Sequence, residues 1–199
     1  MSSATRRDSK TLILDAAKSI ILEKGYAAAG LNEILSAAGV PKGSFYHYFK
    51  SKEDFGVELI KKNLSETAEL YREFLVNSAL NPYERFVAFY STILTFHRQH
   101  NCRDFCIVAK LGPEVSFSSD AMRKIQSQGV RVWLDIIESC LKQGIKDGVI
   151  NKKIDPAGTA AMMHDLWQGA LVRSQIDQNV QPLENAFETI KAILLAKGK

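Results

Sequence analysis

The sequence lacks the features that mark several common classes of protein. Its cysteines, Cys102, Cys106 and Cys140, are odd in number and form no CxxC pair or Cys/His cluster, so neither a disulfide framework nor a zinc site is expected. No apolar run approaches the roughly 18 residues that a membrane span requires, and no apolar stretch follows the basic N-terminus. We therefore expect a cytoplasmic protein with no metal, no cofactor and no membrane partner.

Patterns typical of catalysis are also missing. No Ser/His/Asp set, paired carboxylates or phosphate-binding glycine loop is recognisable. A thiol enzyme would need a base beside its nucleophile, and the nearby histidines are His97 and His100, at the end of an otherwise plain helix. The formal net charge of +4 is modest, but Gly39–Lys52 contains three lysines and no acidic residue. This patch suits phosphate contact better than catalysis, and we do not expect an enzyme.

Apolar residues recur with helical spacing from end to end, and no alternating strand pattern is convincing. The predicted fold class is therefore all-α. A change of composition near residue 65 divides an N-terminal domain, 8–64, from a larger helical domain, 65–199. Helices are predicted over 8–24, 31–38, 41–49, 51 to beyond 64, 82–100, 105–111, 119–146, 156–177 and 182–196.

Residues 30–49 have the pattern of a helix-turn-helix. Two short helices meet across Ala38-Gly39-Val40-Pro41, where glycine permits a sharp turn and proline suits the first position of the next helix. Phe45 and Phe49 share one face of that helix and would anchor it, which leaves its polar side chains exposed. This division is typical of a DNA recognition helix. Ordinary packed helices have the same composition, so a dimeric interaction module that does not bind DNA is an alternative.

The sequence resembles the tetracycline-repressor (TetR) family in the stretches Ile13–Ala17, Glu23–Tyr26 and Ala38–Lys52. The resemblance implies a small DNA-binding domain on a larger helical domain that binds a ligand and dimerises. A homodimer would then match a palindromic, double-stranded DNA operator. On the family pattern, the groove would be contacted by Lys42, Gly43, Ser44, His47 and Tyr48, and the phosphates by Tyr46 and Lys52.

One departure from the family pattern affects the first helix of the motif. Many members carry a threonine pair where this chain has Gly30 and Leu31, so the hydroxyl contacts of that pair are missing. Asn32, which faces outward in the first turn, is predicted to take their place. Arg6 and Arg7 suggest a basic arm that reaches DNA.

Cys106 is expected in the first turn of a helix that starts after a break at 101–104, with Asp104 as its cap. The helix dipole, Arg103 and Lys110 would lower the pKa of this thiol, whereas Asp104 would raise it. The alternative is a small buried hydrophobe, the commoner state of a free cysteine.

Residues 106–116, together with 182–186, resemble the N-ethylmaleimide-responsive branch of the family. The resemblance implies that Cys106 reacts with electrophiles or oxidants and so releases a repressor from DNA. Relatives with the same C-terminal pattern sense small reactive acids such as acrylate. Gln175 stands where the nearest relatives place a basic partner for the thiol, with Arg173 as a candidate substitute. A non-covalent effector, and a helical thiol enzyme that consumes electrophiles, are the alternatives.

The last two helices carry apolar stripes of small and large residues. These stripes indicate either a four-helix bundle across a two-fold axis, as in TetR-like proteins, or the core of one chain. Cys140 falls on a further stripe that is expected in the core. The two C-terminal stripes contain Ala157, Ala160, Ala161, His164, Trp167, Ala170 and Leu171, and then Leu183, Ala186, Phe187, Ile190 and Leu194. His164 is expected to be a packed residue and not a ligand.

Overall fold

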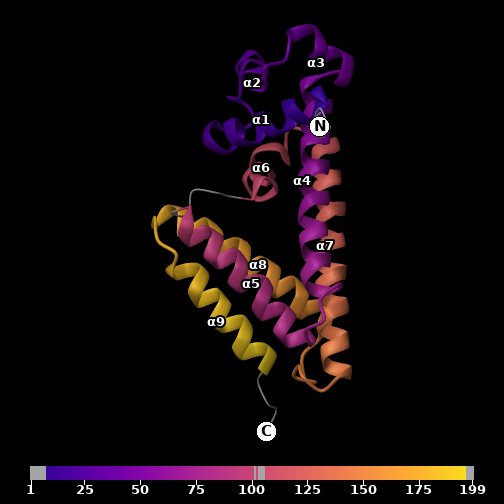
Figure 1. Ribbon diagram of the computed structural model, residues 1–199, viewed down its shortest axis with the longest axis vertical. Helices are drawn as coiled ribbons and strands as arrows, with labels where there is room; N and C mark the ends of the chain where they lie inside the picture. The colour runs from indigo at the N-terminus through magenta and orange to yellow at the C-terminus, as the bar shows by residue number, and fades with distance from the viewer. Residues whose placement is uncertain (1–7, 101, 103–105, 196–199) are drawn as a thin grey trace, which may run out of the picture. The chain divides into compact units, whose positions relative to one another are not determined.

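The computed structural model describes residues 8–100, 102 and 106–195, and every regular element among them is an α-helix (Figure 1). The all-α prediction is therefore confirmed. None of the described helices combines the length and apolarity that would let it span a membrane. The helices are α1 (Ser9–Lys24), α2 (Leu31–Ala38), α3 (Lys42–Tyr48), α4 (Lys52–Leu75), α5 (Pro82–Gln99), α6 (Ile107–Val115), α7 (Asp120–Lys146), α8 (Pro156–Ile176) and α9 (Gln181–Leu195).

Helix α6 is the element whose extent differs most from the sequence prediction. The prediction ended it at Leu111, but the helix continues to Val115 with Pro113 inside it. Proline lacks an N–H and removes one helical hydrogen bond, a loss that the last turns of a short helix tolerate. The N-cap of α6 is Cys106; the predicted cap, Asp104, lies outside the described residues.

The described residues form two compact units. The first contains the residues up to Leu64 together with Cys106–Ser127, and the second contains the described parts of Ser65–Phe105 and Gln128–Lys199. The divisions fall inside α4 and α7. Helix α6, distant in sequence from the N-terminal helices, therefore belongs to the first unit.

The core of the first unit is built around α1, which packs against α2, α3 and α6. Ile13, Ala17 and Ile21 are fully buried on α1, and their spacing of three to four residues places them on one face. Helix α6 contributes Ile107 and Leu111, which are 2% and 0% exposed. Apolar burial therefore joins α6 to the N-terminal helices.

Three phenylalanines fix the position of α3 in the first unit. Phe45 and Phe49 are at most 1% exposed, as is Phe55 of α4. The ring centroids lie 5.0 Å apart for Phe45–Phe49, 5.7 Å for Phe45–Phe55 and 5.3 Å for Phe49–Phe55, within the range of favourable aromatic pairs. The predicted anchoring face of this helix is confirmed.

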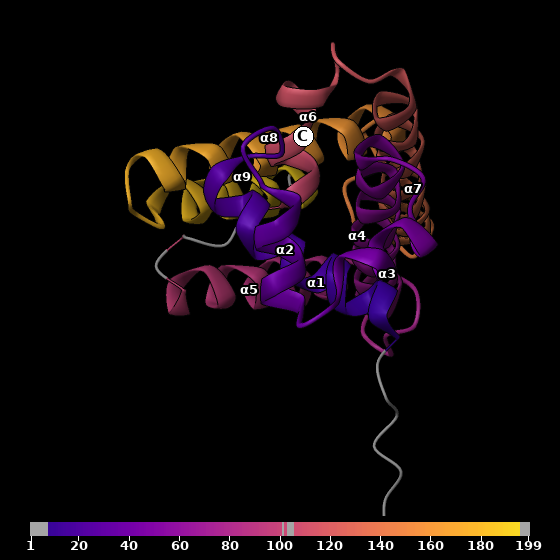
Figure 2. The same cartoon turned by 90° about the horizontal axis from the view of Figure 1, so that it is seen from above.

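The second unit contains α5, α8 and α9, with α8 and α9 packed side by side (Figures 1 and 2). Its centre is aromatic: Tyr90 of α5 lies 4.8 Å from Trp167 of α8 between ring centroids. Proline begins both α5 and α8, and the preceding residue caps each helix. Asn81 accepts a hydrogen bond from the Glu84 N–H, and Asp155 accepts one from the Gly158 N–H, as expected of N-cap residues.

Most residues of the two predicted C-terminal stripes are buried within the single chain. Of the two interpretations left open by the sequence, the core of one chain therefore accounts for them. His164 is only 8% exposed and packs 5.9 Å from Trp133 between ring centroids, and burial lowers the pKa of its imidazole. The buried members are Ala160, His164, Trp167, Ala170, Leu171, Leu183, Ala186, Phe187, Ile190 and Leu194.

Replacement of Gly56 tests the packing of the first unit. A Cβ at this position of α4 would lie 2.1 Å from Met122 Cε and 2.6 Å from the Tyr26 hydroxyl. We expect Gly56→Ala to lower the free energy of unfolding by about 1–3 kcal/mol, the usual cost of overpacking, measured by urea denaturation. Gly43→Ala is the control, because a Cβ there meets nothing within 4 Å. Equal stability of Gly56→Ala and wild type would contradict this packing.

Candidate nucleic-acid interface and thiol site

The turn between α2 and α3 has the backbone of a helix-turn-helix. Gly39 ends α2 in the left-handed conformation, with φ +65°, which glycine adopts without a steric penalty. Its N–H donates to the Ser36 carbonyl, and the Val40 N–H donates to the Leu35 carbonyl. Val40 is buried and Pro41 is the N-cap of α3. These contacts set the direction in which α3 leaves the turn.

The residues predicted to contact DNA lie around the side of α3 that the phenylalanines leave open. Ser44 and Tyr48 are half-buried. The Tyr48 hydroxyl donates to Asp8 Oδ1 over 3.1 Å, so Asp8 binds α3 and makes no side-chain cap on α1. The exposed members of the predicted set on this helix are Lys42, Gly43, Tyr46 and His47.

Asn32 and Lys42 line one hollow of about 370 Å³ at the α2–α3 turn. The hollow also contains Ser36, an exposed residue one helical turn after Asn32. Sequence reasoning missed Ser36, although its i+4 spacing from Asn32 could have identified it. The amide, hydroxyl and ammonium groups of residues that line one hollow can hydrogen-bond to base edges and phosphates.

Lys52 is exposed, but its ammonium group already has partners within the protein. It donates to the carbonyl oxygens of Ala27 and Ala29, each at 3.1 Å, and lies 5.2 Å from the centroid of the Tyr26 ring. An ammonium group has three N–H donors, so one remains for a phosphate. Lys52, the predicted phosphate ligand, therefore also stabilises the segment before α2.

Ser51, where the fourth helix was predicted to begin, caps the start of α4. Ser51 Oγ accepts a hydrogen bond from the Asp54 N–H at 3.0 Å, and Asp54 Oδ2 accepts one from the Lys50 N–H at 2.9 Å. Reciprocal bonds of this kind fix the start of a helix. They place Lys50 and Lys52 on either side of a rigid helix end.

The thiol of Cys106 is half-buried at the N-cap of α6. Burial raises its pKa above the usual value, while the backbone N–H groups of Ala109 and Val108 and the charge of Lys18 act in the opposite direction. Desolvation therefore outweighs the helix end in setting the pKa of this thiol, an effect that the expected charges did not include. The cation that acts on the thiol is Lys18 of α1 and not Lys110; Arg103 lies outside the described residues.

The other two cysteines are also buried, which was predicted for Cys140. Burial raises the pKa of Cys140 to about 11, and its Sγ lies 3.9 Å from the Pro82 carbonyl oxygen. Burial also raises the pKa of Cys102. Arg173, the candidate substitute for the missing basic partner, is paired at 2.8 Å with Asp177, the C-cap residue of α8. In the described residues, no three metal-binding side chains gather into a site.

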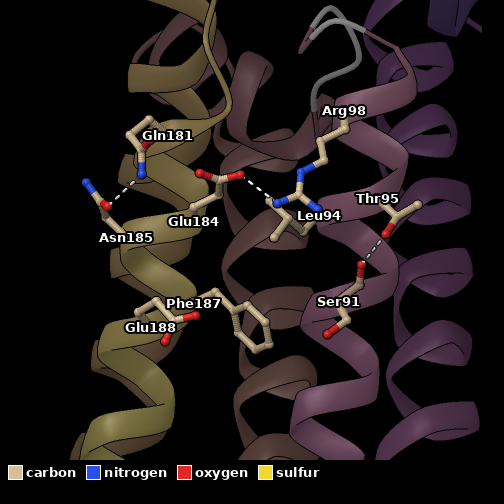
Figure 3. A pocket seen from close by; sticks show the side chains of 9 residues that line it. All are labelled: Ser91, Leu94, Thr95, Arg98, Gln181, Glu184, Asn185, Phe187 and Glu188. Atoms are coloured by element: carbon tan, nitrogen blue, oxygen red, sulfur yellow. Dashed lines mark hydrogen bonds and ion pairs between the residues drawn. The ribbon is translucent and has the colours of Figure 1, made fainter.

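A groove of about 430 Å³ between α5 and α9 contains none of the predicted site residues (Figure 3). Arg98 of α5 and Glu184 of α9 form an ion pair of 2.6 Å across it, and Leu94 and Phe187 contribute its apolar surface. Exposed pairs of this kind contribute little to stability. The arrangement is that of a solvated helix junction.

An aromatic-anchored short helix, a glycine-containing turn and exposed lysines and polar groups define a helix-turn-helix DNA-binding protein. Comparison with known proteins leads to the same class. Residues 13–59 match the model of "Bacterial regulatory proteins, tetR family", and residues 82–190 match that of "Tetracyclin repressor-like, C-terminal domain".

Relatives cover nearly the whole chain. The chain is 32% identical over 194 residues to the HTH-type transcriptional repressor NemR of Escherichia coli K12, which covers 98% of each protein. It is 31% identical to the transcriptional regulator AcuR of Cereibacter sphaeroides, over 85% of this chain and 77% of AcuR. A crystal structure of reduced E. coli NemR superposes with a TM-score of 0.88 and 32% identity, over 94% of this chain and 97% of that one.

The chain belongs to the tetR family of bacterial regulatory proteins. Membership confirms the predicted N-terminal helix-turn-helix and the helical C-terminal domain. It also confirms the prediction of a DNA-binding transcription regulator and not an enzyme, because members of the family are named as regulators.

Neutralisation of Lys42 tests the DNA interface. Because Lys42 is exposed beside Asn32, we expect Lys42→Gln to weaken binding to all DNA sequences and to reduce the slope of log Kd against log salt by about 1. The measurement is a salt series on an operator duplex selected from a randomised library with the wild-type protein. Lys142→Gln is the control, since Lys142 lies on α7 and pairs with Glu138 at 2.6 Å. An unchanged slope for Lys42→Gln would remove this residue from the interface.

Proposed function

We propose that this protein is a homodimeric repressor that leaves a palindromic operator when an electrophile reacts with Cys106. The observation that carries the proposal is the position of Cys106. It is the N-cap of α6 and belongs to the same compact unit as the helix-turn-helix. NemR, which is similar over almost its full length, is named as a repressor. In this proposal residues 8–64 bind DNA, and residues 65–199 contain the sensing and dimerising elements.

The packing around Cys106 supports a steric mechanism. The residues that follow it, Ile107 and Val108, are 2% and 6% exposed, and α6 packs against α1. A group added to a half-buried thiol has no free volume between such helices, because protein interiors are close-packed. The adduct therefore displaces α6 from α1 and shifts the population away from the DNA-binding arrangement.

The reaction is a conjugate addition. The thiolate of Cys106 attacks the electron-poor C=C bond of N-ethylmaleimide, forms an S–C bond, and the neighbouring carbon takes a proton from water. The N–H groups of Ala109 and Val108 and the charge of Lys18 favour the thiolate. Lys18 thereby supplies the cation that Gln175 cannot supply.

A dimer surface is available on α8. Met162, Val172 and Ile176 are 37%, 45% and 71% exposed, and Gly169 is exposed between them. Their spacing places them along one stripe of the helix. An exposed apolar stripe with a glycine, where a second helix can approach closely, favours pairing with a second copy across a two-fold axis.

A non-covalent small-molecule effector is the second candidate. It is favoured by the burial that raises the pKa of the Cys106 thiol, because a mainly protonated thiol reacts slowly at neutral pH. In that case α6 would still move, but no bond to sulfur would form.

Replacement of the thiol separates these two candidates. We expect Cys106→Ser to bind the selected operator as wild type does and to stay bound after treatment with N-ethylmaleimide, because the reactive sulfur is gone. Gel shift measures release, and mass spectrometry of the intact protein measures adduct formation. Cys140→Ala keeps Cys106 and is the control that should still release. Full release of Cys106→Ser would reject the covalent mechanism.

A charge on the α8 stripe tests the dimer. Val172→Asp is expected to yield monomers in analytical ultracentrifugation, because an unpaired carboxylate would be buried at the interface. Operator affinity should fall by about 10²-fold or more, since two half-sites are no longer bound together. Val76→Asp is the matched control: Val76 is 52% exposed but lies after α4, away from this stripe. A dimeric Val172→Asp protein would place the interface elsewhere.

A further inference from the structure

The turn between α1 and α2, residues 25–30, is held by two oppositely charged side chains from distant parts of the sequence. Glu114 of α6 accepts hydrogen bonds from its N–H groups, and Lys52 of α4 donates to its carbonyl oxygens. All of these residues belong to the first compact unit. We call residues 25–30 the α1–α2 turn.

The carboxylate of Glu114 contacts two consecutive backbone amides. Oε2 lies 2.9 Å from the Tyr26 nitrogen and Oε1 lies 2.6 Å from the Ala27 nitrogen. Charge-assisted bonds of this length are among the stronger hydrogen bonds in proteins. Gly25 makes the approach possible: its φ is +85°, and a Cβ there would lie 3.2 Å from Glu114 Oε2.

Tyr26 connects the two charged side chains. Its N–H donates to Glu114, its hydroxyl donates to the Lys52 carbonyl oxygen, and its ring lies beneath the Lys52 ammonium group. Burial, followed by the nearby carboxylates of Glu53 and Glu114, raises the pKa of Tyr26. The hydroxyl therefore stays protonated and remains a donor at every physiological pH.

The α1–α2 turn leads directly into the helix-turn-helix. The Gly30 carbonyl oxygen accepts the first hydrogen bond of α2, from the Ile34 N–H at 3.1 Å. Asn32, which lines the hollow shared with Lys42, lies two residues beyond the turn. A shift of the turn therefore moves the start of α2 and the polar groups it presents.

The backbone N–H groups of the α1–α2 turn do not need Glu114 in order to be hydrogen-bonded. Ala27 and Ala28 are exposed, so water could reach the amide groups of this segment. Glu114 lies eight residues after Cys106, roughly 12 Å along the axis of the same helix. Any movement of α6 therefore acts on the two amides that Glu114 binds.

We propose that Glu114 is a positioning residue through which α6 holds the α1–α2 turn, and with it α2, in the arrangement that binds DNA. Loss of the two amide contacts lets the turn relax and weakens the operator complex. The proposal extends the proposed function, because it names the contact through which displacement of α6 at Cys106 reaches the helix-turn-helix.

The first test is the effect of Glu114 on operator affinity. We expect Glu114→Ala to raise the Kd for the selected operator by roughly tenfold, from the loss of two charge-assisted bonds to a partly exposed turn. Glu114→Gln keeps one acceptor oxygen and should raise it less. Far-UV circular dichroism and urea denaturation should stay close to wild type. Glu138→Ala is the control, because Glu138 lies on α7 in the second compact unit and pairs with Lys142 at 2.6 Å. Wild-type operator affinity in Glu114→Ala would overturn the proposal.

The second test separates a positioning role from a local structural one. Operator Kd is measured for wild type and Glu114→Ala, each before and after alkylation with N-ethylmaleimide. If α6 acts through Glu114, alkylation raises the operator Kd of Glu114→Ala by a much smaller factor than that of wild type. The effects of the substitution and of alkylation on Kd are then not multiplicative. Multiplicative effects would overturn the coupling. If alkylation does not release wild type at all, the proposed function fails, while the unmodified variants still decide the role of Glu114.

Discussion

Helix α3 depends on the packing of Phe45 and Phe49 against Phe55. It has seven residues, whereas an isolated helix needs roughly 12–15 residues to be even marginally stable in water. Its conformation is therefore a product of tertiary packing. Because the three rings occupy one face, the rest of the helix is free to carry glycine, lysine and hydroxyl groups, which contribute little to folding but suit a DNA surface. The stability of the unit and the chemistry of the interface are thus separated on one short helix.

Local sequence signals were sufficient for most of the secondary structure. Prolines mark the first turns of α5 and α8, and Gly39 marks the turn before α3, because each residue restricts or permits a particular backbone geometry. The same signals failed at Gly112-Pro113, where the packing of Leu111 and Val115, which are 0% and 1% exposed, keeps the helix intact. The prediction of the DNA-facing side of α3 followed from periodicity. The contact of Glu114 with the α1–α2 turn had no such signal, since Glu114 lies 88 residues after Tyr26 and 87 residues after Ala27 in the sequence.

Two sequence-based expectations, for the α8 and α9 stripes and for the Cys106 thiol, depended on which residues pack against them. The periodicity of the sequence does not reveal those neighbours. The small and large residues of α8 and α9 were candidates for a dimer interface or for the core, and within one chain Trp167 and Phe187 are already buried. The exposed stripe runs along another side of α8. Similarly, the effects expected on the pKa of Cys106 were those of the helix end and of the charges near it in sequence. Desolvation by the residues packed around it, which only the fold determines, has the larger effect.

The discontinuous composition of the first unit also constrains how the protein is made. Domains usually fold during synthesis, N-terminal parts first, but this unit includes residues as late as Ser127. The face of α1 that packs on α6 stays uncovered until α6, which ends at Val115, has left the ribosome. A nascent chain that stops before α6 exposes apolar surface and has an α1–α2 turn without its carboxylate partner. DNA binding by partially synthesised protein is thereby disfavoured until the chain has extended through α6.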